Sequence, residues 1–329
     1  MSGGRQKQAG KRGAAQQPGT DWGGFIEEQT AEIKRTVGNG TAVNAVSGGV
    51  DSSVCTVLGH RALGDRLKTF FIDNALMREG EPERVVKTFA DMGIRVALVD
   101  ARREFLSALK GVTDPEQKRQ AITDTFYSKV FARLVREAGA KFLIHGTILT
   151  DIEETVAGIK RQHNILAQIG IDPEKAYGYA VLEPLKTLRK DGVRAVARAL
   201  GLPAAVCERM PFPGPALAAR IVGEVTEERL RTVRAATAIV EEELADTGAF
   251  QYMAVLLADR ATGIRSGRRE FGEIIVVRCI DSVDARTATV VRLPWEKLER
   301  VCERVTAIRG VNRCLYDLTP KPPATVEYV

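Results

Sequence analysis

Short apolar segments alternate with longer segments of mixed character over the first half of the chain. Four apolar runs have the length and composition of strands, at residues 42–46, 67–73, 94–100 and 140–146. The segments between them combine apolar and charged residues as amphipathic helices do, at residues 51–63, 81–93 and 115–139. This alternation predicts an α/β fold, in which helices cover both faces of a parallel sheet.

The pattern changes at residues 209–221, RMPFPGPALAARI. Three prolines and a glycine within six residues cannot continue a helix or a central strand, so we place a domain boundary near Pro215. A smaller α+β domain is expected beyond it, with helices over 226–248 and 295–310 and a strand over 273–281. The predicted division is a disordered basic tail over 1–20, a first domain over 21–215 and a C-terminal domain over 216–329.

The first expected strand runs into SGGVDSS, residues 47–53, ahead of an expected helix. Unpaired N–H groups and the positive dipole end at a helix start bind anions, and glycine lets backbone approach a ligand closely. Ser and Asp add hydroxyls and a carboxylate that suits magnesium. The order strand, glycine turn, helix therefore predicts a phosphate-binding loop. The string matches neither GxxxxGK[ST] nor GxGxxG, and a capped helix start accounts for only part of it.

Composition and charge narrow the class of protein. With 329 residues, 27% charged and 44% hydrophobic, the chain is typical of a soluble globular protein with room for two domains. No apolar run approaches the roughly 20 residues of a membrane span, and no secretory signal is visible, so we expect a cytoplasmic protein. The net charge of +6 suits small anions at least as well as nucleic acid, and no nucleic-acid partner is expected.

The five cysteines show no CxxC pair and no metal-ligand spacing. We expect small, buried, reduced thiols.

Several motifs together resemble one enzyme family. SGGVDSSV matches the pyrophosphate-binding loop of the N-type ATP pyrophosphatases, which split ATP between the α and β phosphates and adenylylate a substrate oxygen. FFIDNALMREGE, HGTILTDIEET, GIKRQHN, RMPFPGPALAARIVGEVT and PKPPATVEYV resemble, in order and spacing, segments of the GMP synthase branch of that family. From about Trp22 to its last residue, the chain is similar to the ATP-pyrophosphatase part of GMP synthase.

The resemblance implies ATP and Mg²⁺ as cofactors, and XMP or a related nucleotide as acceptor. It also implies a homodimer formed through the C-terminal domain and a separate glutaminase subunit that supplies ammonia. The residues expected to bind ATP are Ser47, Gly48, Gly49, Asp51, Ser52, Ser53, Asp73, Asn74 and Gly146. The expected catalytic residues are Asp151, Glu154, Lys160 and His163, with Asp51 and Asp151 as metal ligands. The residues expected to bind the acceptor are Arg209, Pro213, Gly214, Gln251, Lys321, Thr325, Val326 and Glu327.

Some positions depart from the family pattern. Arg161 and Gln162 stand where the family has Ser or Thr and the first His of HHN, and Gln cannot act as an acid or base. RSGRREF is one residue shorter than the corresponding family segment and lacks its Asp. Three further replacements are Met210 for His, Ala216 for Gly and Val329 for Glu. The phosphate loop is intact, so this distribution favours retained ATP use and leaves an altered acceptor open.

The sequence is therefore compatible with three functions. The preferred one is the synthetase subunit of GMP synthase, which adenylylates XMP before ammonia displaces AMP. The second is a paralogue that activates another oxo-group for ammonia or sulfur transfer, with Cys207 as the first candidate for sulfur handling. The third is a non-catalytic subunit that binds nucleotide and regulates a partner, although the intact loop counts against it.

Overall fold

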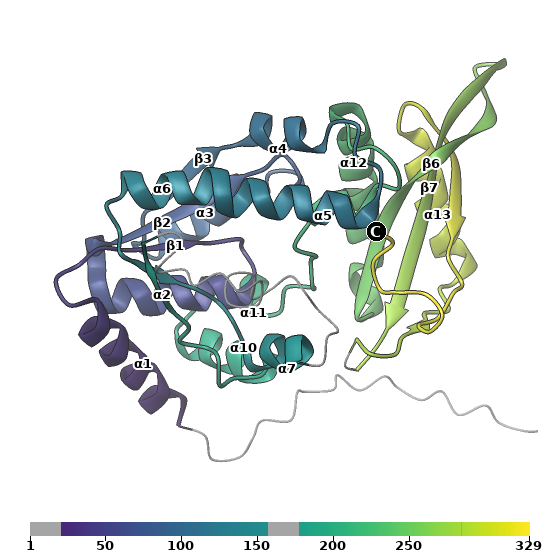
Figure 1. Cartoon of the computed structure of the whole chain (residues 1–329). Helices are drawn as coiled ribbons and strands as arrows, with labels where there is room; N and C mark the ends of the chain where they lie inside the picture. Colours follow the sequence, from purple (N-terminus) through teal and green to yellow (C-terminus); the bar gives the residue numbers. More distant parts are fainter. Residues whose placement is uncertain (1–20, 157–177, 284) are drawn as a thin grey trace, which may run out of the picture.

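The computed structural model describes residues 21–156, 178–283 and 285–329. The basic tail expected over residues 1–20 lies outside them. Figure 1 shows two units side by side, an α/β unit in purple to teal and a C-terminal unit in green to yellow. No described helix combines the length and the apolar character that crossing a bilayer requires.

The first unit is built on a parallel sheet of five strands in the order β3-β2-β1-β4-β5. From β1 the chain passes to β2 and β3 on one side, and afterwards to β4 and β5 on the other. Ligands bind at such a switch point, beyond the carboxyl ends of β1 and β4. The strands are β1 (Ala42–Ala45), β2 (Leu67–Asp73), β3 (Val96–Asp100), β4 (Phe142–Ile144) and β5 (Ala180–Leu182).

Helices cover both faces of this sheet, as predicted. Phe71 and Ile72 are neighbours on β2, yet they are buried in different clusters on opposite faces. Both faces of the inner strands β1, β2 and β4 largely exclude water, which is why these strands are apolar runs, whereas edge strand β3 leaves Leu98 48% exposed. One face carries α1 (Trp22–Val37), α2 (Val50–Leu63), α3 (Glu81–Asp91) and α10 (Lys190–Ala199). The other carries α4 (Arg102–Leu109), α5 (Pro115–Asp124), the π-helical η2 (Thr125–Phe131) and α6 (Ala132–Glu137).

The C-terminal unit packs two helices on a small sheet. Long antiparallel strands β6 and β7 meet at Ser266 and Gly267, whose φ angles of 50° and 73° form a two-residue hairpin turn. β9 pairs in parallel with β7, and α12 and α13 pack on β6 and β9. The elements are α12 (Glu227–Leu244), β6 (Gln251–Arg265), β7 (Arg268–Asp281), β8 (Thr289–Val290), α13 (Trp295–Ala307) and β9 (Val311–Tyr316).

Short helices connect these elements. They are η1 (Gly64–Arg66), α7 (Leu149–Val156), α11 (Ala204–Cys207), η3 (Ala216–Arg220) and η4 (Ala245–Thr247).

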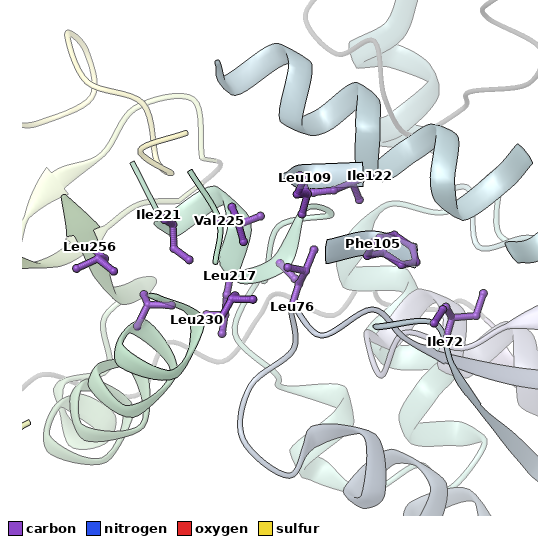
Figure 2. Close-up of a cluster of buried hydrophobic side chains, with 14 of the residues drawn as sticks. Ile72, Leu76, Phe105, Leu109, Ile122, Leu217, Ile221, Val225, Leu230 and Leu256 are labelled. Carbon is purple, nitrogen blue, oxygen red and sulfur yellow. The ribbon is translucent and has the colours of Figure 1, made fainter. Parts of the chain in front are cut away.

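One hydrophobic cluster runs through the junction of the two units (Figure 2). Leu76 and Phe105 of the first unit and Leu217 of the second are fully buried in it. Polar contacts follow the same path, since buried Lys118 donates from Nζ to the Ile221 carbonyl at 2.6 Å. Burial, with a smaller contribution from the charge of Arg229, lowers the pKa of Lys118 to about 8. The units therefore share a core rather than touching at their surfaces.

Candidate functional site

The predicted phosphate loop connects β1 to α2. Gly48 has a φ of +77°, which glycine adopts without strain. A Cβ there would lie 2.6 Å from Nη1 of Arg209 and 2.7 Å from Cγ2 of Val85, so a larger residue does not fit. Ser52 fixes the turn, because its Oγ accepts from the Ser47 backbone N–H at 3.1 Å and donates to the Gly49 carbonyl at 3.1 Å.

Two polar atoms of this loop are buried without a hydrogen-bond partner among the described residues. They are Oδ1 of Asp51 and Oγ of Ser53, both in the first turn of α2. Such atoms cost folding free energy unless something else satisfies them. Their position at the positive end of α2, beyond the carboxyl end of β1, fits a ligand that carries phosphate and a cation.

Two cations border the loop. Nζ of Lys190, at the start of α10, lies 2.5 Å from Oδ2 of Asp51. The Arg209 guanidinium lies against Gly48 and pairs with Glu81 of α3, whose side chain is 3% exposed. Burial lowers the pKa of Arg209, while the charge of Glu81 opposes that shift. These charges can neutralise phosphate oxygens held at the start of α2.

The segment after β4 lies directly against the same loop. A Cβ on Gly146 would be 3.2 Å from the Asp51 carbonyl carbon and the Ser52 nitrogen, so the two segments approach at van der Waals distance. His145 accepts from the Cys55 thiol through its carbonyl, and its Nδ1 lies 2.8 Å from Oγ1 of Thr147. Both strand ends at the switch point thus meet.

Asp73 and Asn74 shape the end of β2. Their Oδ1 atoms accept from the backbone N–H groups of Ala75 at 3.0 Å and Leu76 at 2.9 Å. Ala75, inside this turn, has a positive φ of 66°. Both predicted side chains therefore hold a tight turn at the carboxyl edge of the sheet.

A second polar cluster forms around the C-terminal tail. The side chain of Glu327 pairs with fully buried Arg220, with Oε2 3.2 Å from Nε. Its Oε1 also accepts from Nε2 of Gln251 at 2.7 Å. Nη1 of Arg220 has no hydrogen-bond partner among the described residues. Glu327 therefore links the tail to η3 and to the start of β6.

The other predicted tail residues are engaged as well. Nζ of Lys321 donates to the Ala285 carbonyl at 2.8 Å, and the Thr325 carbonyl accepts from Arg278 at 3.0 Å. Val326 packs on the sheet face formed by Met253, Val255 and Val276. The tail is consequently docked on the C-terminal sheet.

The segment RMPFPG, residues 209–214, connects the two clusters. Arg209 borders the phosphate loop, while the Pro211 carbonyl accepts from Gln251 at 3.4 Å in the tail cluster. Phe212 lies between the guanidinium groups of Arg78, at 3.9 Å, and Arg220, at 4.9 Å. The predicted residues Pro213 and Gly214 follow, and the Pro213 carbonyl accepts from Ala216. Three residues therefore span from one cluster to the other.

Of the four expected catalytic residues, only Asp151 has a described side chain. Asp151 lies in the first turn of α7, where its Oδ2 accepts from the Ile148 N–H at 3.1 Å. Lys160, Arg161, Gln162 and His163 lie outside the described residues, as does the side chain of Glu154. Sequence reasoning did not single out Lys190, Glu81 or Arg220. Glu81 and Arg220 lie inside the family-like segments FFIDNALMREGE and RMPFPGPALAARIVGEVT, which were a signal that could have found them. Lys190 lies in none of the quoted segments.

Comparison with known proteins places these motifs in a family. The family model described as NAD synthase matches residues 25–228, and that described as GMP synthase C terminal domain matches residues 238–328. The B subunit of the glutamine-hydrolyzing GMP synthase of Archaeoglobus fulgidus is 51% identical over 305 residues, 92% of this chain and 98% of its own. The protein of the same name from Pyrococcus horikoshii is 49% identical over 312 residues, 94% of this chain and 99% of its own. The chain belongs to the family of GMP synthase B subunits.

The NAD synthase match covers the whole parallel-sheet unit, which confirms the fold class predicted for this member of the GMP synthase family. A solved NH3-dependent NAD synthetase from Campylobacter jejuni superposes with a TM-score of 0.44 and 17% identity, over 60% of this chain and 80% of that one.

The departures from the GMP synthase pattern have distinct places. Ala216 has a positive φ of 53° and is 1% exposed, so it keeps a glycine-like backbone inside the core. Met210 lies beside β6, where its Sδ accepts from the Tyr252 N–H at 3.3 Å. RSG falls at the β6–β7 hairpin turn. Val329 is buried, and its N–H donates to the Ala219 carbonyl at 3.2 Å, so the tail end is anchored without the family's Glu.

Proposed function

We propose that this chain catalyses the ATP-dependent amination of XMP to GMP, with ammonia from a separate glutaminase subunit. The XMP C2 oxygen attacks the α phosphorus of ATP, pyrophosphate leaves, and ammonia then displaces AMP from C2. The observation that carries this proposal is the RMPFPG connection between the phosphate loop and the tail cluster. Because this short segment joins the two clusters, it supports a site in which ATP and a second nucleotide bind next to each other.

In this proposal, the loop binds the leaving pyrophosphate. The N–H groups at the start of α2 offer donors, and Lys190 and Arg209 add positive charge. The hydroxyls of Ser47 and Ser52 would exchange their present hydrogen bonds within the loop for bonds to phosphate. Protein groups that are already positioned to stabilise the charge developing in the transition state usually contribute most to catalysis of this kind. Positioning of the two nucleotides supplies much of the rest.

The proposed reaction uses magnesium, and Asp51 is the residue proposed to bind it. Its unpartnered Oδ1, beside the expected phosphates, is the hard anionic oxygen that Mg²⁺ prefers. Within the described parts of the chain, no three His, Cys, Asp or Glu side chains gather into a metal site, so phosphate oxygens and water would complete the shell. The ion would neutralise charge on the departing pyrophosphate.

The acceptor site is proposed at the tail cluster, with Gln251, Lys321 and Glu327 as contacts. Their present partners are protein groups: Arg220, the Pro211 carbonyl and the Ala285 carbonyl. Binding would therefore exchange some of these contacts for nucleotide contacts. Asp151, Glu154, Lys160 and His163 are proposed as the catalytic residues, with Asp151 as a second metal ligand.

A homodimer through the C-terminal unit is also proposed. Ile264 and Phe271 near the β6–β7 hairpin turn lie on the same face of the two strands and are 81% and 61% exposed. Exposed apolar side chains gathered on one unit are typical of an association surface. Light scattering of the eluting protein would show twice the chain mass, and Phe271→Glu should shift it to the single chain.

The deciding experiment measures pyrophosphate release from ATP and magnesium, with XMP and ammonium, against controls that lack XMP. We expect XMP-dependent release and one GMP formed per pyrophosphate. ATP binding without XMP-dependent release would reject XMP as acceptor, and a screen of other purine nucleotides would then separate a paralogue from a non-catalytic subunit. Adding the glutaminase partner with glutamine in place of ammonium tests the ammonia source.

A further inference from the structure

Two cysteines of the C-terminal unit come together although they are 12 positions apart in the chain. Cys302 is exposed on α13, and Cys314 is half-buried on β9. The helix turns into the strand over residues 308–310, where the Val311 N–H donates to the Ile308 carbonyl at 3.1 Å. Cys302 lies about 8 Å before the end of α13 at Ala307, at 1.5 Å per helical residue. Cys314 lies about 10 Å after the start of β9 at Val311, at 3.3 Å per strand residue, so the two cysteines lie at a similar height.

Side-chain directions agree with this placement. Asn312, Cys314 and Tyr316 alternate with exposed Arg313 and Leu315 along β9. Cys314 packs against the core cluster that also contains Val301 and Val305 of α13. Cys302 follows Val301 directly and lies one turn before Val305, so it stands at the edge of the helix face that covers the strand.

The two thiols also interact with each other and differ in their surroundings. Burial raises the pKa of Cys314 to about 12, and the charge and side-chain hydrogen bond of Cys302 add to the shift. Cys314 is therefore a protonated thiol at neutral pH, whereas Cys302 is open to solvent. The expectation of buried thiols is confirmed for Cys55, Cys207 and Cys279 but wrong for Cys302.

We propose that Cys302 and Cys314 form a redox-responsive pair, in which Cys302 reacts with hydrogen peroxide and Cys314 resolves the product to a disulfide. In the first step, Cys302 reduces the peroxide by two electrons and becomes a sulfenic acid, with release of one water. In the second, the Cys314 sulfur attacks the sulfenic sulfur and the S–S bond forms. The Cys314 proton leaves with the sulfenic hydroxyl as a second water. A dithiol reductant reverses the change by exchange.

Formation of this bond would act on the tail through β9. Tyr316 ends the strand, and the next residue, Asp317, pairs with fully buried Arg278 at 2.5 Å and accepts from the Tyr328 hydroxyl at 2.9 Å. A cross-link between α13 and β9 would fix the strand from which the tail starts. It would also restrict the unfolded chain, which raises the melting temperature. This inference is independent of the proposed reaction.

The test uses the full chain treated with dilute hydrogen peroxide, then alkylated and mapped by mass spectrometry. We expect Cys302 and Cys314 to lose alkylation together and to appear in one cross-linked peptide, while Cys55, Cys207 and Cys279 do not change. The melting temperature should rise on oxidation and return with dithiothreitol. Cys302→Ser should keep Cys314 alkylatable, and Cys314→Ser should leave a Cys302 sulfenic acid that dimedone traps.

Several outcomes would overturn the proposal. One is Cys302 oxidised alone in the wild type, with Cys314 still fully alkylated. Another is a Cys302 disulfide between two chains, detected by its mass on a non-reducing gel. If either serine variant unfolds, the corresponding variant Cys302→Ala or Cys314→Ala replaces it. Oxidation of Cys302 alone in the wild-type protein would overturn the proposal without any variant.

Discussion

The phosphate loop and the C-terminal tail are both polar, but they use their polar groups differently. In the loop, Oδ1 of Asp51 and Oγ of Ser53 are buried without partners among the described residues. In the tail, Glu327 and Asp317 each bind a fully buried arginine, and Glu327 also holds Gln251. The tail cluster also leaves Nη1 of Arg220 and Nε of Arg278 without a hydrogen-bond partner among the described residues, so the difference lies in the carboxylates. Asp51 keeps a buried oxygen that the fold does not use, whereas the oxygens of Glu327 and Asp317 all hold the tail in place.

This difference predicts which property each region controls. An unpartnered buried atom already costs stability, so its removal should change binding and turnover more than folding. A carboxylate that compensates a buried guanidinium is needed by the fold itself, so its removal leaves an uncompensated charge. Variants in the two regions can therefore separate the two effects.

The largest effect is expected for Asp51→Ala. Loss of the proposed magnesium and phosphate contact should lower XMP-dependent pyrophosphate release by about 100-fold or more. The melting temperature should change little, because the exposed partner Lys190 contributes at most about 1 kcal/mol through its ion pair. Asp191→Ala, an exposed neighbour in the first turn of α10, is the matched control. Near-normal turnover of Asp51→Ala would reject this phosphate site.

Next comes Glu327→Gln, which keeps the shape of the side chain and removes its charge. Arg220 would remain buried and charged without its counter-ion, so the free energy of unfolding should fall by about 3 kcal/mol. Urea denaturation followed by circular dichroism measures this loss. Glu303→Gln, exposed on α13, should stay within about 0.5 kcal/mol of the wild type. If Glu327→Gln left the free energy of unfolding unchanged but abolished XMP binding, the tail would control binding, as the loop does. The proposed difference between the two regions would then be wrong.

A smaller effect on stability is expected inside the loop from Gly48→Ala. The positive φ and the close Arg209 and Val85 atoms should together cost about 2 kcal/mol of unfolding free energy. Gly49→Ala is the matched control, because Gly49 has a φ of −74° and its Cβ would meet only the Ser47 hydroxyl, at 3.4 Å. Equal losses in the two variants would show that the shape of Gly48 is not what the loop requires.

The smallest effects are expected at two alanines with positive φ, one near each region. Ala75→Gly should stabilise the chain by about 0.5 kcal/mol, because the relief of left-handed strain exceeds the added chain entropy. Ala216→Gly also loses a buried methyl worth about 0.8 kcal/mol, so its net change should be near zero. Thermal melts of the two variants side by side test the sign. Destabilisation by Ala75→Gly would contradict the strain argument.

The sequence predicted four of the five strands of the first unit and missed the three-residue β5, together with helices α1, α4 and α10. The predicted strands β1 and β2 lie in the middle of the sheet and are largely buried. Such strands become uninterrupted apolar runs, and 67–73 coincides with β2. Strand β6 was missed, since its second half, ADRATGIR, is largely exposed and carries no period-two apolar pattern. The helix expected over 115–139 is helical throughout most of its length, but a π-helical segment interrupts it, which periodicity alone does not reveal.

Within the site, the sequence located groups that are close along the chain. SGGVDSS and HGTILTD follow neighbouring strands of the sheet, so a parallel topology brings them together by itself. Glu81 and Arg220 lie in the family-like segments 70–81 and 209–226, which were a signal for them. Lys190 reaches the loop only through tertiary packing, and no local pattern distinguishes it from a solvated charge. The same is true of Cys302 and Cys314, which a helix–strand turn brings level.

The continuous core between Leu76 and Leu217 has a consequence for how the molecule comes apart. Because each unit contributes side chains to the same buried cluster, neither can melt without exposing apolar surface of the other. Heat should therefore produce one cooperative transition, in which calorimetric and van't Hoff enthalpies agree. A chain cut after Pro215 would release two fragments that each lack half of a shared interior, and neither would be expected to behave as an autonomous folding domain.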